Sequence, residues 1–181
     1  IKSAIVGGTA SVISGSKFVN GAITGAFQYS LNWATKAHNY LIKQAYGKEL
    51  SKIEIAAMEA GSKYTDRLAN QDDENSYQHS MTSSKNPDVA KMGIRRDQWV
   101  TDQVVYGVSA LDGSLRGNIS GYFRIGMGIH AVMDQYSPAH TGTNQHWHMK
   151  DFYKHGPFPT SLEGTRTVVQ PKYNFIVDKM K

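Results

Sequence analysis

The stretch Gly-Ile-His-Ala-Val-Met-Asp-Gln-Tyr-Ser-Pro-Ala-His-Thr, residues 128–141, decides how this chain folds. His130 and Asp134 are four residues apart in it, so a helix places an imidazole and a carboxylate one turn apart on the same face. Pro138 breaks the helix and turns the chain back shortly before His140. Because imidazole and carboxylate groups both bind divalent cations, this segment is typical of a metal site.

The rest of the chain also has helical patterns. Ser51 and Glu54 have the spacing of a capping box, and regularly spaced apolar residues follow them. Gly126 and Gly128 would lower the stability of an exposed helix, so we expect a neighbouring element to pack closely against them. Helices are expected over about 51–68, 89–111 and 118–136, with a shorter helix over about 146–155 and a short strand over 165–169.

Composition divides the chain near residue 35. Residues 1–35 are rich in glycine and carry only Lys2 and Lys17 as charged residues. They contain neither a membrane-spanning run of about 20 apolar residues nor the pattern of a signal peptide. We expect a glycine-rich lead-in over 1–35 and one domain over 36–181, which is an all-α helical bundle with a metal site between its helices and an irregular C-terminal tail.

The absence of cysteine restricts the chemistry. With no cysteine among its 181 residues, the chain has no disulfide, no thiolate metal ligand and no cysteine nucleophile. Histidine and carboxylate are then the strong metal ligands that remain. The net charge of +5 favours anionic partners, which include lipid headgroups, nucleic acid and acidic proteins, but does not choose among them.

Further candidate ligands lie upstream and downstream of residues 128–141. Asp66 and His79 flank an acidic loop and complete a site if their helices pack against the helix of His130. A single histidine in a helix is more often an ordinary surface or core residue, so the prediction depends on several of them converging. The remaining histidines are His38, His146, His148 and His155.

The order of these residues resembles the zinc-dependent phospholipase C and single-strand nuclease superfamily. The specific part of the resemblance is the spacing His-x3-Asp-x3-Pro-x-His over residues 130–140, and the whole match covers about residues 33–155. It implies an all-helical fold that binds two or three zinc ions. The matching residues, in chain order, are His38, Asp66, His79, His130, Asp134, His140 and His148.

The resemblance also implies which residues hold which ion. His140 and His148 would belong to a second zinc ion and His38 to a third. Asp66 is in addition the candidate catalytic residue, because it could orient or deprotonate the attacking water. The first ion would be held by Asp66, His79, His130 and Asp134, of which Asp134 also bridges to another ion.

The last motif of the family is not reproduced in full. The family has three residues between this histidine and an acidic residue, whereas two residues separate His148 from Asp151. Asp151 is therefore a candidate ligand. His146 and His155 are the alternatives for the same position.

The third ion depends on a tryptophan. The family binds this ion through the free amino group of an N-terminal tryptophan, and Trp33 lies five residues before His38, as in the nuclease branch. Here Trp33 lies inside the chain. Cleavage before Trp33 would free its amino group; without cleavage we expect the third ion to be weakly held or absent.

The lead-in carries a second resemblance. Residues 5–11 (IVGGTAS), 15–22 (GSKFVNGA) and 24–27 (TGAF) look like the junction that follows the core of Rhs-type polymorphic toxins. Such a junction precedes a variable C-terminal toxin domain. The resemblance implies a type VI secretion effector that is secreted and delivered into a target bacterial cell during interbacterial competition. Its partners would be the Rhs core, the secretion apparatus and a cognate immunity protein.

Three functions follow as hypotheses. The first is a phospholipase C-like toxin that hydrolyses membrane phospholipids with a zinc-activated water. The second is a zinc-dependent nuclease toxin that cuts single-stranded DNA or RNA, which the basic charge and the spacing of Trp33 and His38 favour. The third is a non-enzymatic membrane-disrupting toxin, in which the histidines do not converge. In both hydrolases, Arg95, Arg96 and Arg124 are candidates for holding the substrate phosphate.

Overall fold

A computed structural model describes residues 35–137 together with 140, 146 and 180. These residues form helices and connecting loops, and the described part of the chain contains no strand beyond an isolated parallel bridge between Thr82 and His146. The predicted all-α class is therefore confirmed. The elements are a helical segment over residues 35–46, α3 (Lys52–Thr65), the short 3-10 helices η1 (Leu68–Asn70) and η2 (Ser76–His79), α4 (Val89–Ser109) and α5 (Leu115–Tyr136).

Side-chain caps set where the long helices begin. The capping box predicted at the start of α3 is present: Ser51 N donates to Glu54 Oε2 at 2.7 Å, and Glu54 N donates to Ser51 Oγ at 3.4 Å. Asp88 caps α4 and Ser114 caps α5, each by accepting backbone N–H groups of the first turn. The cap at Ser114 explains why α5 begins at Leu115 and not at the expected residue 118.

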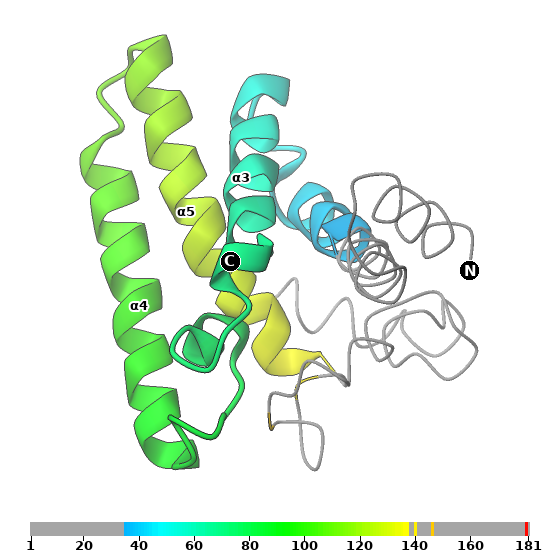
Figure 1. Cartoon of the computed structure of the whole chain (residues 1–181). Coiled ribbons are helices and arrows are strands. Elements are labelled where there is room, and N and C mark those ends of the chain that lie inside the picture. The colour runs from blue at the N-terminus through cyan, green and yellow to red at the C-terminus, as the bar shows by residue number, and fades with distance from the viewer. Residues whose placement is uncertain (1–34, 138–139, 141–145, 147–179, 181) are drawn as a thin grey trace, which may run out of the picture.

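Helix α5 lies between α3 and α4, with the helical segment 35–46 beyond α3 (Figure 1). Helices α3 and α5 run in the same direction, and Asn118 near the start of α5 donates a 3.4 Å hydrogen bond to Glu54 near the start of α3. Helix α4 runs antiparallel to α5, with Arg124 donating to Gln103 across the pair at 3.2 Å. As a result, α3 and α5 end at the same end of the bundle.

Gly126 and Gly128 of α5 allow α3 and α4 to approach closely, as the sequence predicts. A Cβ at Gly126 would overlap the backbone carbonyl of Met58 on α3. A Cβ at Gly128 would lie 3.2 Å from the Val100 carbonyl oxygen and the Gln103 Cβ on α4. The conformational cost of glycine in a helix is thus offset by close packing on two faces.

The core lies mainly where the segment 35–46, α3 and α5 meet. Ile42, Met58 and Met133 are almost completely buried there. Ile94 and Val105 lie on α4 and fit its apolar pattern. They are nevertheless 72% and 55% exposed, because α4 packs against α5 on one side only. None of the helices in the described ranges is both long enough and apolar enough to span a membrane.

Several sequence predictions fall outside the described residues. They are the glycine-rich lead-in apart from Thr35, the helix expected over 146–155 apart from His146, and the strand expected over 165–169. Pro138, Trp33, His148, Asp151 and His155 are outside as well.

Candidate metal centre

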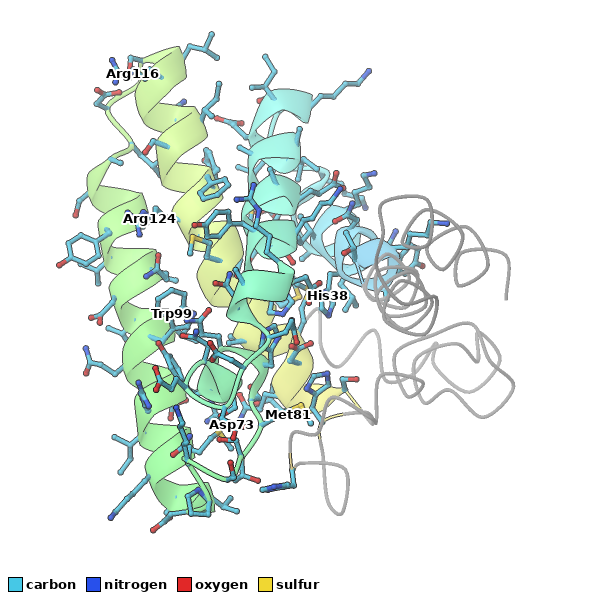
Figure 2. All side chains as sticks on the ribbon, viewed as in Figure 1. His38, Asp73, Met81, Trp99, Arg116 and Arg124 are labelled. Atoms are coloured by element: carbon cyan, nitrogen blue, oxygen red, sulfur yellow. The ribbon has the colours of Figure 1, made fainter. Side chains whose placement is uncertain are left out.

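Histidines and aspartates from separate elements meet near the end of the bundle where α3 and α5 terminate. His130 and Asp134 lie on the last turns of α5, as the spacing of the sequence predicts. Asp66 is the residue that caps the C-terminus of α3, and His79 is the last residue of η2. The segment 35–46 adds His38 (Figure 2), and the chain after α5 adds His140.

Asp134 is the centre of this cluster. Its Oδ2 lies 3.0 Å from His130 Nε2 and 3.3 Å from His79 Nδ1. Its Oδ1 lies 3.1 Å from His38 Nε2 and 3.7 Å from His140 Nε2. Each carboxylate oxygen therefore faces a different pair of imidazoles.

Asp66 supplies the second carboxylate. Its Oδ1 lies 3.5 Å from His130 Nε2, and its Oδ2 lies 3.7 Å from His38 Nδ1. Thr35 also donates a 3.4 Å hydrogen bond from Oγ1 to Asp66 Oδ2. His130 thus lies between the two aspartates, and the edge of its ring also meets those of His38 and His79, with ring centroids 4.6 and 5.1 Å apart.

Hydrogen bonds hold the imidazoles from outside the cluster. Ser62, one turn before Asp66 on α3, has its Oγ 3.2 Å from His130 Nδ1. The Gln71 amide nitrogen lies 3.0 Å from His79 Nε2. His140 Nδ1 donates to the backbone carbonyl of His79 at 2.7 Å, which leaves His140 Nε2 directed at Asp134. Such contacts orient histidines and select the nitrogen that is free to bind a metal.

The cluster is shielded from solvent. His130 is completely buried, and Asp134 is 1% exposed. Burial lowers the pKa of His130 below its ordinary value, although the neighbouring Asp134 and Asp66 partly oppose this. Burial alone would raise the pKa of Asp134, but the charges of His140 and His130 outweigh it and hold that pKa well below its ordinary value.

The ligand atoms are close enough together to hold a metal ion. Two buried groups, one formed by His38, Asp66 and His130 and the other by His79, His130 and Asp134, each offer ligand atoms within 4.8 Å of one another. Asp134 Oδ1 is buried and accepts no hydrogen bond from a described residue despite its short distance to His38. A cation stabilises buried carboxylate oxygens that lie beside imidazole nitrogens, so this donor set fits a divalent metal.

The predicted ligands His38, Asp66, His79, His130, Asp134 and His140 are brought together. His146, an alternative last ligand, lies instead beside Thr82, whose Oγ1 is 3.3 Å from His146 Nδ1. It belongs to neither of the two groups of potential ligands. His148, Asp151 and His155, together with Trp33, lie outside the described residues.

The arginines proposed for phosphate binding have other partners in the structure. Arg95 stacks over the ring of Tyr77, 4.3 Å from its centroid. Arg96 pairs with Asp97 at 2.7 Å, and Arg124 donates to Gln103. No contact recorded among the described residues connects these arginines with the histidine cluster.

The residues that orient the histidines are not among the site residues predicted from the sequence. Ser62 has a recognisable signal, because it precedes Asp66 by one helical turn and therefore shares its face. Gln71 and Ser80 have none, since each acts from a loop or a 3-10 end whose position depends on the tertiary fold. Ser80 adopts the left-handed conformation, with φ 54°, directly after His79.

Comparison with known proteins gives no match to a family model, to a curated protein sequence or to a solved structure. The geometry of the cluster and the motifs of the sequence are therefore the features that indicate a function.

Proposed function

We propose that this protein is a zinc-dependent phosphodiester hydrolase. The observation that carries the proposal is the position of Asp134, whose two oxygens face separate pairs of histidines within a buried cluster. A single structural ion would need only one of these pairs. A carboxylate shared between two pairs suits a site with more than one ion, in which the ions bind the attacking and leaving oxygens of a phosphodiester.

The ligand sets follow from the distances. Asp134 Oδ2, with His79 and His130, would hold one ion, and Asp66 Oδ1 is close enough to His130 to complete its shell. Asp134 Oδ1 faces His38 and His140, which would serve the neighbouring ions. Imidazole and carboxylate ligands without thiolates are typical of hydrolytic zinc sites, which keep a position open for water.

Zinc bound by these ligands would polarise a phosphodiester oxygen and lower the pKa of a bound water to about 7. The protein contributes orientation and proton transfer. We assign Asp66 as the group that orients or deprotonates the water, because among the described residues its Oδ2 has only the 3.4 Å hydrogen bond from Thr35 and the 3.7 Å approach to His38. Ser62 and Gln71 fix the rings of His130 and His79.

Membrane phospholipid is the substrate that we propose. The supporting observation is the phospholipase-like spacing over residues 130–140, together with the toxin-like junction of the lead-in. On this proposal the chain is the toxic domain of a larger secreted protein, is delivered into a target bacterial cell and is neutralised by a cognate immunity protein. The basic net charge of +5 is compatible with an anionic lipid surface.

The proposal is tested by metal content and by hydrolysis. We expect purified protein to contain zinc and to release diacylglycerol from phosphatidylethanolamine/phosphatidylglycerol vesicles, and Asp134→Asn to abolish both properties. Asp97→Asn is the matched control, because Asp97 lies exposed on α4 and its carboxylate pairs with Arg96, outside the histidine cluster. Protein that binds no zinc and loses no toxicity on substitution of Asp134 would contradict the proposal.

The same preparation separates the two hydrolases. Single-stranded DNA and RNA are incubated with zinc-loaded protein beside the vesicles. Release of diacylglycerol without cleavage of nucleic acid supports the phospholipase. Cleavage of nucleic acid without release of diacylglycerol assigns the cluster to the nuclease.

A further inference from the structure

The hydrogen bond between Gln71 and His79 raises a question about where the proton of His79 lies. Gln71 and His79 are both buried, and the Gln71 amide nitrogen is 3.0 Å from His79 Nε2. The other ring nitrogen, Nδ1, lies 3.3 Å from Asp134 Oδ2 and 3.1 Å from His130 Nε2. The two nitrogens of this ring therefore face different kinds of partner.

A neutral imidazole carries one proton, so one ring nitrogen donates and the other accepts. Asp134 Oδ2 is a carboxylate oxygen and can only accept. When Nδ1 donates to Asp134, Nε2 must accept, and the amide N–H of Gln71 is the donor that it meets. The 3.0 Å distance between the Gln71 amide nitrogen and His79 Nε2 fits this arrangement.

Metal binding through Nδ1 reverses these roles. A nitrogen that binds a metal must offer its lone pair, so the proton of His79 moves to Nε2, which then needs an acceptor. The carbonyl oxygen of Gln71 meets that need after half a turn of the amide about its terminal bond, because the oxygen and nitrogen of an amide occupy nearly equivalent positions. An aspartate or glutamate in place of Gln71 could only accept, and a lysine could only donate.

We propose that Gln71 is a positioning residue that matches the tautomer of His79 to metal binding: its amide N–H faces Nε2 when Nδ1 carries the proton, and its carbonyl oxygen faces Nε2 when Nδ1 binds a metal. The inference rests on the proposed metal site. It explains why a side chain that can both donate and accept is buried at this place, where an unsatisfied polar group would destabilise the protein. Gln71 would thus keep His79 hydrogen-bonded in both states.

The test uses the whole chain with zinc as the probe. Nitrogen-15 spectra of the histidine rings report which nitrogen of His79 carries the proton, in protein treated with chelator and in protein loaded with zinc. We expect the proton on Nδ1 in the first and on Nε2 in the second. Because zinc bound through Nδ1 would move the proton whatever residue stands at position 71, these spectra test which nitrogen of His79 binds the metal, and the variants at position 71 test the role of Gln71.

Two variants provide the affinity measurement, made by competition with a coloured chelator. Gln71→Met has similar length but neither donates nor accepts, and we expect its zinc affinity to fall about tenfold. Gln71→Glu retains the acceptor, so we expect it to restore or exceed the wild-type affinity. Circular dichroism of the chelated proteins shows whether each variant is folded.

The possible outcomes distinguish this inference from the proposed function. If the wild type binds zinc but Gln71→Met binds it equally well, or if the proton of His79 stays on one nitrogen, the role of Gln71 is wrong and the metal site stands. If the wild type binds no zinc, both proposals are wrong. A tautomer change together with a weaker Gln71→Met and a rescued Gln71→Glu supports the inference.

Discussion

The hydroxyl of Ser80 donates a 2.6 Å hydrogen bond to the backbone carbonyl of Ala131, which joins the end of η2 to α5 directly beside two of the clustered histidines. Ser80 follows His79, and Ala131 follows His130. The hydrogen bond thus holds the backbones of both histidines in register. Ser80 makes this hydrogen bond from the left-handed backbone conformation, which residues other than glycine adopt at a cost in free energy.

Two substitutions of Ser80 distinguish the contribution of its hydroxyl to stability from that of its backbone conformation. Ser80→Gly removes the hydrogen bond but suits the left-handed conformation, so we expect a loss of about 1 kcal/mol in the free energy of unfolding. Ser80→Ala removes the same bond and keeps the conformational cost, and we expect a larger loss, by about 1 kcal/mol. Urea denaturation of the two variants measures the difference. Equal losses would show that the backbone conformation at Ser80 contributes nothing.

The close contact between α3 and α5 predicts the effect of a larger residue at Gly126. Alanine is the better helix former, but its Cβ would overlap the Met58 carbonyl, which cannot move without shifting α3. We therefore expect Gly126→Ala to lower the free energy of unfolding by about 1–3 kcal/mol. Gly93→Ala is the control, because the nearest atom to its Cβ would be the flexible end of Arg96 at 3.9 Å. That variant should be more stable by about 0.5–1 kcal/mol, and a similar gain at Gly126 would contradict the packing.

Removal of metal should destabilise the fold, since the ligands come from separate elements that an ion would hold together. At a free zinc concentration a thousand times the dissociation constant, binding adds about 4 kcal/mol. For a chain of 181 residues this corresponds to roughly 10 °C in Tm. Thermal denaturation with zinc and with chelator measures the shift. Asp134→Asn should show almost no shift, and a shift equal to that of the wild type would place the ion elsewhere.

The lowered pKa of His130 predicts how the chelated protein responds to acid. In the unfolded chain His130 takes up a proton near pH 6.5, whereas in the folded state burial keeps it neutral to lower pH. The unfolded state then binds more protons, so the contribution of His130 to stability is complete above about pH 6.5 and is lost as the pH falls toward its folded pKa. Asp134, whose pKa is lowered as well, adds a further loss below its ordinary value of 3.8.

The measurement is urea denaturation of chelated wild type and His130→Gln between pH 7.5 and about 5. We expect the wild type to lose stability more steeply than the variant over this range, by at most about 1.4 kcal/mol per pH unit for one proton. Parallel curves for the two proteins would show that His130 does not titrate differently in the folded and unfolded states.

The features that the sequence predicts correctly are those that depend on residues close together in the chain. The capping box at Ser51 and Glu54 and the spacing of His130 and Asp134 depend on residues within one helical turn, and both are present as expected. The expected close packing of a neighbouring element on Gly126 and Gly128 is confirmed as well. It could be predicted because glycine lowers the stability of a helix wherever the helix lies in the fold. Helix ends are less well predicted, since caps such as Ser114 compete with the apolar pattern.

The sequence alone therefore determined the three long helices, the capping box of α3 and the face of α5 that carries an imidazole and a carboxylate. The tertiary structure decided which distant side chains meet that face: His38 and His79 reach Asp134 from 96 and 55 residues away in the chain. It also decided which oxygen of Asp134 each histidine faces, that Gln71 and Ser62 contact the rings of His79 and His130, and that Ser80 joins the backbone beside them. Helical periodicity states which residues share a face but not which element covers it, because that depends on how whole helices pack.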